Sequence, residues 1–149
     1  MANKLELTWY GKDDPIKVEP RLLIENAALS NIAADPNTEN MLIHGDNLLA
    51  LKALEKKFAG QVKCIYIDPP YNTGNAFDKY DDNIEHSIWL NLMECRFKYL
   101  YSLLRKDGFL FVNLDEQEHA YAKVLLDGIF GRKKLYRRYY LAKTQGRWK

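Results

Sequence analysis

The stretch CIYIDPPYNTGN, residues 64–75, places a carboxylate, two prolines and an aromatic ring directly after an apolar run. Proline lacks a backbone N–H and fixes its own φ, so a strand formed by the apolar run has to end at Asp68. Pro69 and Pro70 then hold Asp68 and Tyr71 on a stiff turn. An isolated Asp-Pro pair can be a simple turn residue. Here the arrangement predicts that the carboxylate and the ring are presented to a ligand.

Strand-like and helix-like segments alternate on both sides of this stretch. Short apolar runs at residues 41–45, 62–67 and 109–114 predict buried strands. Leucines at helical spacing predict a helix over residues 47–58, and an apolar stripe from Trp89 to Leu104 predicts another. A final helix over residues 115–130 has acidic residues in its first turn, where the helix dipole favours them. This order is typical of α/β folds with parallel strands and crossover helices.

The amino-acid composition is that of a soluble globular protein. The 149 residues are 47% hydrophobic and 28% charged with a net charge of +2, which suits one soluble globular domain. The sequence has no apolar run of membrane-spanning length and no signal peptide, so we expect a cytoplasmic protein without membrane contact. Cys64 lies inside an apolar run and should be a buried free thiol. The three histidines are scattered, so no metal site is predicted.

Polar residues follow each of the three predicted strands. Asp46 and Asn47 follow the first, Asp68 follows the second, and Asn113 with Asp115 follows the third. Ligands of parallel α/β sheets bind at the carboxyl ends of the strands, so this edge of the sheet is the candidate site. Asp46 and Asn47 also suit the N-cap of the helix that follows them. Capping and ligand contact are compatible, and both remain open for this pair.

The Asp-Pro-Pro-Tyr tetrapeptide suits chemistry at an amine attached to an aromatic ring. Such an amine is a poor nucleophile because its lone pair is delocalised into the ring. The Asp68 carboxylate and the Pro69 carbonyl can accept its two N–H bonds, and they stabilise the positive charge that develops on nitrogen in the transition state. Tyr71 offers a flat face on which an extruded base can stack.

Asp-Pro-Pro-Tyr is also the catalytic motif of amino-methyltransferases that act on nucleobases. Together the strings LIHGDNLLALKAL (42–54), CIYIDPPYNTGN (64–75) and HSIWLNLMECRFKYLYSLLRKDGFLFVNLDEQE (86–118) resemble the β-group adenine-N6 DNA methyltransferases. The resemblance is to the modification subunit of type III restriction–modification systems in particular. LTWYGKDD and VEPRLLIE near the start are similar to the opening of that subunit. The resemblance covers most of residues 5 to 130.

The resemblance implies a fold and a catalytic site. The fold would be an incomplete Rossmann-like, S-adenosylmethionine-dependent methyltransferase sheet, mainly of parallel strands with flanking helices. Asp68, Pro69, Pro70 and Tyr71 match the catalytic motif, which holds a flipped adenine of double-stranded DNA against the methyl donor. Cytosine-N4 enzymes more often carry serine in place of the aspartate, and protein-glutamine methyltransferases carry asparagine. Asp68 therefore favours adenine as the target.

The resemblance also implies binding residues and partners. Asp46 and Asn47, together with Asp68, would contact the cofactor S-adenosyl-L-methionine. Tyr71 and Asn72 would contact the target base, because Asn72 lies where the family's loop begins to close over it. A restriction subunit and a second modification subunit are the partner proteins that a type III system implies.

The chain divides into three parts on this reading. Residues 1–40 form an N-terminal extension, residues 41–131 a partial catalytic domain that carries Asp-Pro-Pro-Tyr, and residues 132–149 a basic, aromatic tail. The tail contains eight basic and no acidic residues, with four aromatic residues among them. Such a composition suits a surface that tracks phosphates and stacks bases. A solvated chain terminus has the same composition, and both interpretations stay open.

A second family motif, an aromatic residue followed by Gly-x-Gly, is absent, because no two of the eight glycines are separated by a single residue. We therefore expect a truncated form that lacks this motif and the target-recognition region, and that neither binds the cofactor usefully nor methylates DNA alone. The alternative is a non-catalytic remnant that binds nucleic acid or a partner subunit. The resemblance further implies that strands 62–67 and 109–114 are neighbours, whereas strands 41–45 and 62–67 are not.

Overall fold

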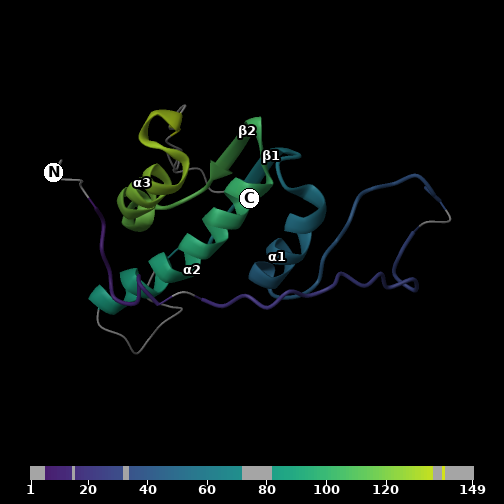
Figure 1. Cartoon of the computed structure of the whole chain (residues 1–149), viewed down its shortest axis with the longest axis horizontal. Coiled ribbons are helices and arrows are strands. Elements are labelled where there is room, and N and C mark those ends of the chain that lie inside the picture. The colour runs from purple at the N-terminus through teal and green to yellow at the C-terminus, as the bar shows by residue number, and fades with distance from the viewer. Residues whose placement is uncertain (1–5, 15, 32–33, 72–81, 136–138, 140–149) are drawn as a thin grey trace, which may run out of the picture.

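A computed structural model describes residues 6–14, 16–31, 34–71, 82–135 and 139. The elements follow the order α1 (Asn47–Phe58), β1 (Val62–Ile67), α2 (Asp82–Leu103), β2 (Leu104–Val112), α3 (Glu116–Phe130) and the short 3-10 helix η1 (Arg132–Lys134). β1 and β2 pair in parallel, and α2 is the crossover that connects them (Figure 1). The predicted α/β class and the predicted pairing of residues 62–67 with 109–114 are confirmed.

Two aspartates start two of the helices. The Asp46 carboxylate accepts hydrogen bonds from the backbone N–H groups of Leu48 and Leu49 at 2.9 and 3.1 Å, and so caps α1. Asp115 caps α3 in the same manner, through the N–H groups of the second and third helical residues. These bonds satisfy backbone donors that have no partner inside a helix. Asp46, and not Asn47, is thus the cap of α1.

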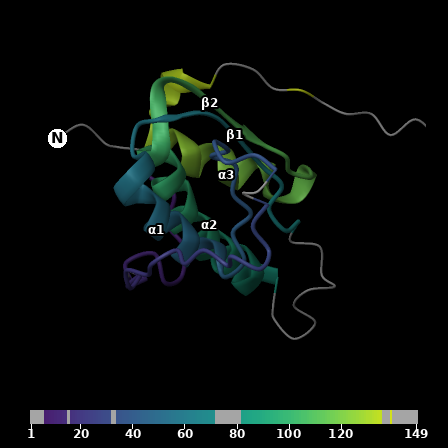
Figure 2. The same ribbon diagram turned by 90° about the vertical axis from the view of Figure 1, so that its right-hand side faces the viewer.

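The core lies between the helices and one face of the strand pair. α2 packs against both α1 and α3, and Figure 2 shows the three long helices on one side of the strands. The buried cluster is made of Trp89, Leu90, Met93, Phe97, Leu100, Ala122 and Leu125. Alternate strand residues pack against this cluster from the inner face of the sheet: Ile65, Ile67, Leu110 and Val112. The predicted apolar stripe of α2 is confirmed, except that the helix ends at Leu103 and Leu104 opens β2.

The outer face of the strand pair is exposed, which corrects the prediction that Cys64 and the strands are buried. Side chains alternate along a strand, so Cys64 and Tyr66 point away from the helices. Cys64 is exposed instead of buried, and Tyr66 is 68% exposed. Phe109 and Phe111, which lie opposite them on β2, are exposed too. The prediction assumed a strand covered on both faces, but the described helices cover only one.

Residues 41–45 do not form the predicted strand. They are irregular, and the side chains of Met41 and Leu42 are exposed. The apolar letters favour a strand, but a strand is stabilised by hydrogen bonds to a neighbour. Within the described part of the chain, β1 and β2 pair only with each other, so residues 41–45 have no strand beside them.

The start of β2 departs from regular pairing. Val62 lies opposite Leu104, whereas Cys64 lies opposite Phe109, so β2 contains extra residues between these two pairs. Gly108 closes this irregular segment. A Cβ at Gly108 would lie 2.9 Å from the carbonyl oxygen of Val62, which is closer than real Cβ contacts allow. Only glycine lets the two strands approach each other here.

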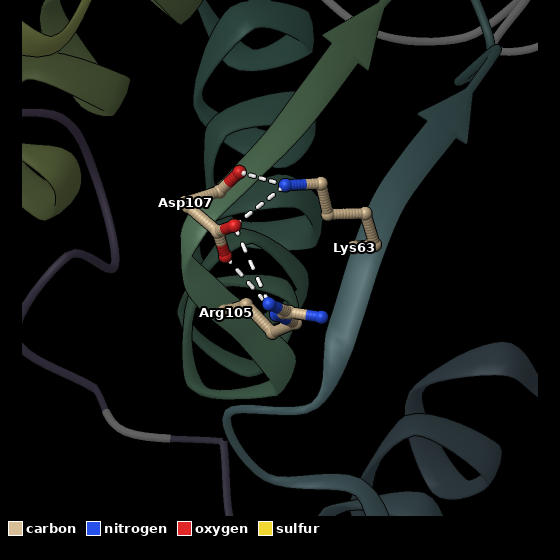
Figure 3. Close-up of polar contacts among 3 residues, drawn as sticks. All are labelled: Lys63, Arg105 and Asp107. Atoms are coloured by element: carbon tan, nitrogen blue, oxygen red, sulfur yellow. Dashed lines mark hydrogen bonds and ion pairs between the residues drawn. The ribbon is translucent and has the colours of Figure 1, made fainter.

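Two cations hold the same irregular segment through Asp107 (Figure 3). Lys63 Nζ donates to the carboxylate of Asp107 at 2.7 Å and to its backbone carbonyl at 2.9 Å. Arg105 Nε donates to the other carboxylate oxygen at 3.0 Å. The hydrogen bond from Lys63 is the main reason why the pKa of Asp107 lies below its ordinary value. Lys63 therefore joins the start of β1 to the irregular segment of β2.

Part of the N-terminal extension packs on α2. Trp9 Nε1 donates to Asn91 Oδ1 at 2.7 Å, and Asn91 Nδ2 donates to the carbonyl of Tyr10 at 2.9 Å. Leu7 and Trp9 also pack against the core. The described residues between 16 and 45 are mostly exposed and run away from the helices and back (Figure 1). The basic tail, predicted over 132–149, lies mainly outside the described residues.

Candidate active site at the strand ends

The carboxyl ends of β1 and β2 bring three polar side chains into contact. The hydroxyl of Tyr71 donates a hydrogen bond to Asp68 Oδ1 at 2.8 Å. Asn113 Nδ2 donates to the same carboxylate oxygen at 3.0 Å and to Tyr71 Oη at 2.5 Å. The three groups form a closed network. Asp68 and Tyr71, which were predicted to be presented together, thus meet through a direct hydrogen bond.

The backbone pairing of the two strands places this network. The N–H of Asn113 donates to the carbonyl of Ile67 at 2.9 Å, so the parallel ladder continues one residue beyond β2. Asp68 follows Ile67 directly. Because parallel strands end at the same edge of a sheet, Asp68 and Asn113 become neighbours although they are 45 residues apart in sequence.

The proline turn is fixed to the core through α2. Trp89 is 1% exposed, and its indole Nε1 donates to the carbonyl of Pro70 at 2.9 Å. A buried indole N–H requires an acceptor, and the turn supplies it. Pro69 is itself buried. Trp89 was predicted only as a core residue. Its hydrogen bond was missed, although a tryptophan within an otherwise apolar stripe is the signal that could have suggested it.

The two carboxylate oxygens of Asp68 differ in their hydrogen bonds. Both side-chain hydrogen bonds, from Tyr71 and from Asn113, go to Oδ1. Among the described residues none donates to Oδ2, so this oxygen is available as an acceptor. The hydrogen bond to Asp68, followed by desolvation, raises the pKa of Tyr71 above its ordinary value. The phenol therefore remains a protonated donor throughout the neutral pH range.

Asp46 and Asn47, at the start of α1, contact α2 at a different place from the proline turn. Arg96 Nε donates to Asn47 Oδ1 at 2.7 Å, and the guanidinium lies 3.9 Å from Asp46 Oδ2. Arg96 stands seven residues after Trp89, which is two turns and about 10 Å along the same face of a helix. Within the described residues no hydrogen bond or ion pair joins Asp46 or Asn47 to Asp68. The structure thus anchors the two predicted parts of the site to one helix, two turns apart.

The remaining predicted residues are placed as follows. Pro69 and Pro70 lie in the anchored turn, and the carbonyl of Pro69 accepts no hydrogen bond from the described residues. Asn72 lies outside the described residues. Asn113 was predicted only as part of the strand-end edge, without a catalytic or binding role, and Arg96 was not predicted at all. The position of Asn113 directly after a strand was the signal for it, whereas no local pattern pointed to Arg96.

Two further properties concern the whole described chain. No described helix has both the length and the apolar character that crossing a bilayer requires. In the same residues, no group of three or more His, Cys, Asp or Glu side chains is arranged to hold a metal ion.

An α/β sheet with an Asp-Pro-Pro-Tyr turn at a strand end defines a class of protein. Residues 62–148, more than half of the chain, match the family model described as DNA methylase, and the chain belongs to this family. The name of the model covers both N6 and N4 methyltransferases. The resemblance seen in the sequence is confirmed.

Particular relatives are restriction–modification proteins. The chain is 53% identical over 94 residues to the probable type III restriction-modification enzyme HindVI Mod subunit of Haemophilus influenzae. This alignment covers 63% of the present chain and 13% of the Haemophilus protein. The chain is 30% identical over 150 residues to the type III enzyme StyLTI Mod subunit of Salmonella typhimurium, covering 82% and 23%. It is 32% identical over 111 residues to the type II methyltransferase M.KpnI of Klebsiella pneumoniae, covering 69% and 27%. The chain thus spans about a quarter or less of the length of these relatives.

Proposed function

We propose that this chain carries the target-amine half of the active site of a DNA adenine-N6 methyltransferase that belongs to a restriction–modification system. The observation that carries the proposal is the network of Asp68, Tyr71 and Asn113 on a turn anchored to the core. Membership of the DNA methylase family supports it. Asp68, in place of serine, favours adenine over cytosine.

Asp68 acts on the amine in this proposal. Its Oδ2 accepts one N–H of the exocyclic amine, while Oδ1 is held by two donors from the protein. The negative charge lies where positive charge develops on the nitrogen during transfer, and a preorganised charge stabilises that transition state most. The carbonyl of Pro69 is the proposed acceptor for the second N–H. Fixed acceptors also orient the nitrogen lone pair toward the methyl donor.

Tyr71 binds the base in this proposal. Its side chain is 37% exposed, and its hydroxyl is tied to Asp68, which restricts rotation of the ring. A flipped adenine that stacks on this ring would bring its amine to the carboxylate beside it. Asn72 is the proposed second contact to the base.

S-adenosyl-L-methionine is the proposed cofactor, and it supplies the methyl group when bound. The residues at the start of α1 are chemically suited to part of it. Capping uses Oδ1 of Asp46, while the side chain stays 57% exposed and keeps Oδ2 as an acceptor for a hydroxyl or amine. Arg96 fixes Asn47 beside it at 2.7 Å. Asp46 and Asn47, together with Asp68, are therefore the proposed cofactor contacts.

The partners are proposed from the relatives. Several of these are named as Mod subunits of type III restriction-modification enzymes. This supports double-stranded DNA as the substrate, and a second modification subunit and a restriction subunit as protein partners.

The test is a product analysis in a full-length context, in which this chain is completed by the remaining part of a related Mod subunit, because we expect the 149 residues alone to be inactive. DNA is incubated with the protein and tritium-labelled S-adenosylmethionine, then digested to nucleosides and separated. We expect N6-methyladenine, and we expect Asp68→Asn, which removes the charge but keeps the shape, to abolish it while the circular dichroism spectrum is unchanged. Recovery of N4-methylcytosine would contradict the assignment to adenine. DNA binding without any methyl transfer would favour the non-catalytic alternative.

A further inference from the structure

The side-chain Nδ2 of Asn113 contacts two residues of the candidate active site. Nδ2 of Asn113 donates toward two acceptors that are themselves hydrogen-bonded to each other, Asp68 Oδ1 at 3.0 Å and Tyr71 Oη at 2.5 Å. The cap of the following helix is Asp115, so capping does not explain the asparagine. The backbone N–H of Asn113 alone completes the ladder with β1, which any residue except proline could do.

The direction of each hydrogen bond follows from the chemistry of the three groups. A carboxylate oxygen can only accept, so the amide must turn Nδ2, and not its oxygen, toward Asp68. The Tyr71 hydroxyl gives its proton to Asp68 and can then only accept from Asn113. Turning the amide over would set its oxygen against the carboxylate, so only one orientation of the Asn113 amide fits.

We propose that Asn113 is a positioning residue for methyl transfer, which holds Asp68 and Tyr71 in one orientation so that Asp68 Oδ2 faces the target amine. The inference rests on the proposed function and extends it to a residue of the neighbouring strand. Asn113 touches neither the base nor the cofactor. It acts through the carboxylate that accepts the N–H and through the ring on which the base stacks.

Loss of Asn113 has a specific consequence for the reaction. Without its amide, Asp68 Oδ1 loses one of its two side-chain hydrogen bonds and keeps the one from Tyr71, so the carboxylate is less restricted in rotation. The turn itself remains attached to Trp89 through the carbonyl of Pro70. Binding of DNA and cofactor should therefore persist, while the fraction of complexes with a correctly directed carboxylate falls.

The experiment compares three variants in the same full-length context, in which the chain is completed by the remaining part of a related Mod subunit. In Asn113→Leu the side chain has a volume similar to that of asparagine but no hydrogen-bond donor. Asn113→Ser keeps one donor in a smaller side chain, and it serves as a second variant in case Asn113→Leu fails to fold. Asn91→Leu is the matched control, because Asn91 also makes two side-chain hydrogen bonds but joins α2 to the N-terminal segment. The measurements are kcat, the KM for DNA and the KM for S-adenosylmethionine from tritiated methyl transfer, and the 13Cζ signal of Tyr71 by NMR.

We expect Asn113→Leu to lower kcat on the order of ten- to hundred-fold, the effect of one hydrogen bond to a charged group, with both KM values within about twofold of wild type. The kcat of Asn113→Ser should lie between those of Asn113→Leu and the wild type. Asn91→Leu should keep the kcat of the wild type. A wild-type kcat in Asn113→Leu would overturn the inference and leave the proposed function standing. Inactivity of the wild-type protein would instead overturn the proposed function. In that case the NMR signal of Tyr71 still tests the positioning role of Asn113. A shift of this signal in Asn113→Leu and not in Asn91→Leu supports the role, and an unchanged signal overturns it.

Discussion

The indole N–H of Trp89 donates a 2.9 Å hydrogen bond to the carbonyl oxygen of Pro70, which joins the buried centre of α2 to the turn that carries Asp68 and Tyr71. A turn on a protein surface usually moves more than the core beneath it. Here the turn has a buried anchor as well as two prolines that restrict its backbone. The Asp-Pro-Pro-Tyr turn and the hydrophobic core should therefore respond together to changes in either.

Trp89→Phe tests this coupling. Phenylalanine keeps an aromatic ring in the core but loses the hydrogen bond to Pro70 and part of the packed volume. We expect a loss of about 1–3 kcal/mol in the free energy of unfolding, measured with urea. We also expect displaced NMR signals for Tyr71, because its turn is no longer held.

Phe97→Leu is the matched control for this variant. Phe97 is also fully buried on α2, but it does not contact the turn through a hydrogen bond. The two variants should lose similar stability, and only Trp89→Phe should displace the signals of Tyr71. Equal displacement in both variants would show that the anchor is not specific to Trp89.

Tyr71 combines two properties that substitutions can separate. Tyr71→Phe keeps the ring but loses the hydrogen bond to Asp68, so we expect bound DNA but a reduced rate of methyl transfer. Tyr71→Ala also loses the stacking surface, which is worth about 1–3 kcal/mol per base. We therefore expect it to bind DNA containing an extrahelical adenine roughly ten- to hundred-fold more weakly.

Fluorescence anisotropy with such a DNA measures the affinity of each variant, and methyl incorporation measures the rate. Equal affinity of the Phe and Ala variants would argue against stacking on the ring. An unchanged rate in Tyr71→Phe would show that the hydrogen bond between Tyr71 and Asp68 does not matter for the reaction.

The sequence predicted the features that depend on interactions between residues close together in the chain. The prolines fixed the end of β1, the spacing of apolar residues predicted the helices, and Asp46 suited a helix cap. The predictions that failed depend on distant parts of the chain. Whether Cys64 is buried depends on what covers its face of the sheet, and whether residues 41–45 form a strand depends on a neighbouring strand.

The contacts within the candidate site also divide into those that depend on nearby residues and those that depend on distant ones. Asp68 and Tyr71 stand three residues apart on a rigid turn, so their meeting could be predicted. The hydrogen bond from Asn113 depends on which two strands are adjacent, and the apolar pattern of β2 does not reveal this. The contact of Arg96 with Asn47 depends on the facing of two helices and on one side-chain rotamer, for which the sequence has no periodic signal.

The ion pair of Lys63 and Asp107 predicts a dependence of stability on pH. The pKa of Asp107 is lowered in the folded chain, mainly by the hydrogen bond from Lys63 and further by Arg105. A carboxyl group with a lowered pKa stabilises the fold above its unfolded-state pKa of about 4, and this contribution is lost as the pH falls through the folded-state pKa. Both side chains are largely exposed, so the effect should also weaken as salt is added.

Lys63→Met tests this contribution. We expect its loss of stability relative to wild type to be largest near pH 6 and to shrink as the pH falls below 4, and we expect the pKa of Asp107, followed by carboxyl 13C NMR, to rise. Part of the loss should persist at all pH values, because Lys63 also donates to the backbone carbonyl of Asp107. On an Asp107→Asn background only this constant part should remain. A stability difference that does not change between pH 6 and pH 2 in the wild-type background would show that Lys63 acts through the backbone carbonyl alone.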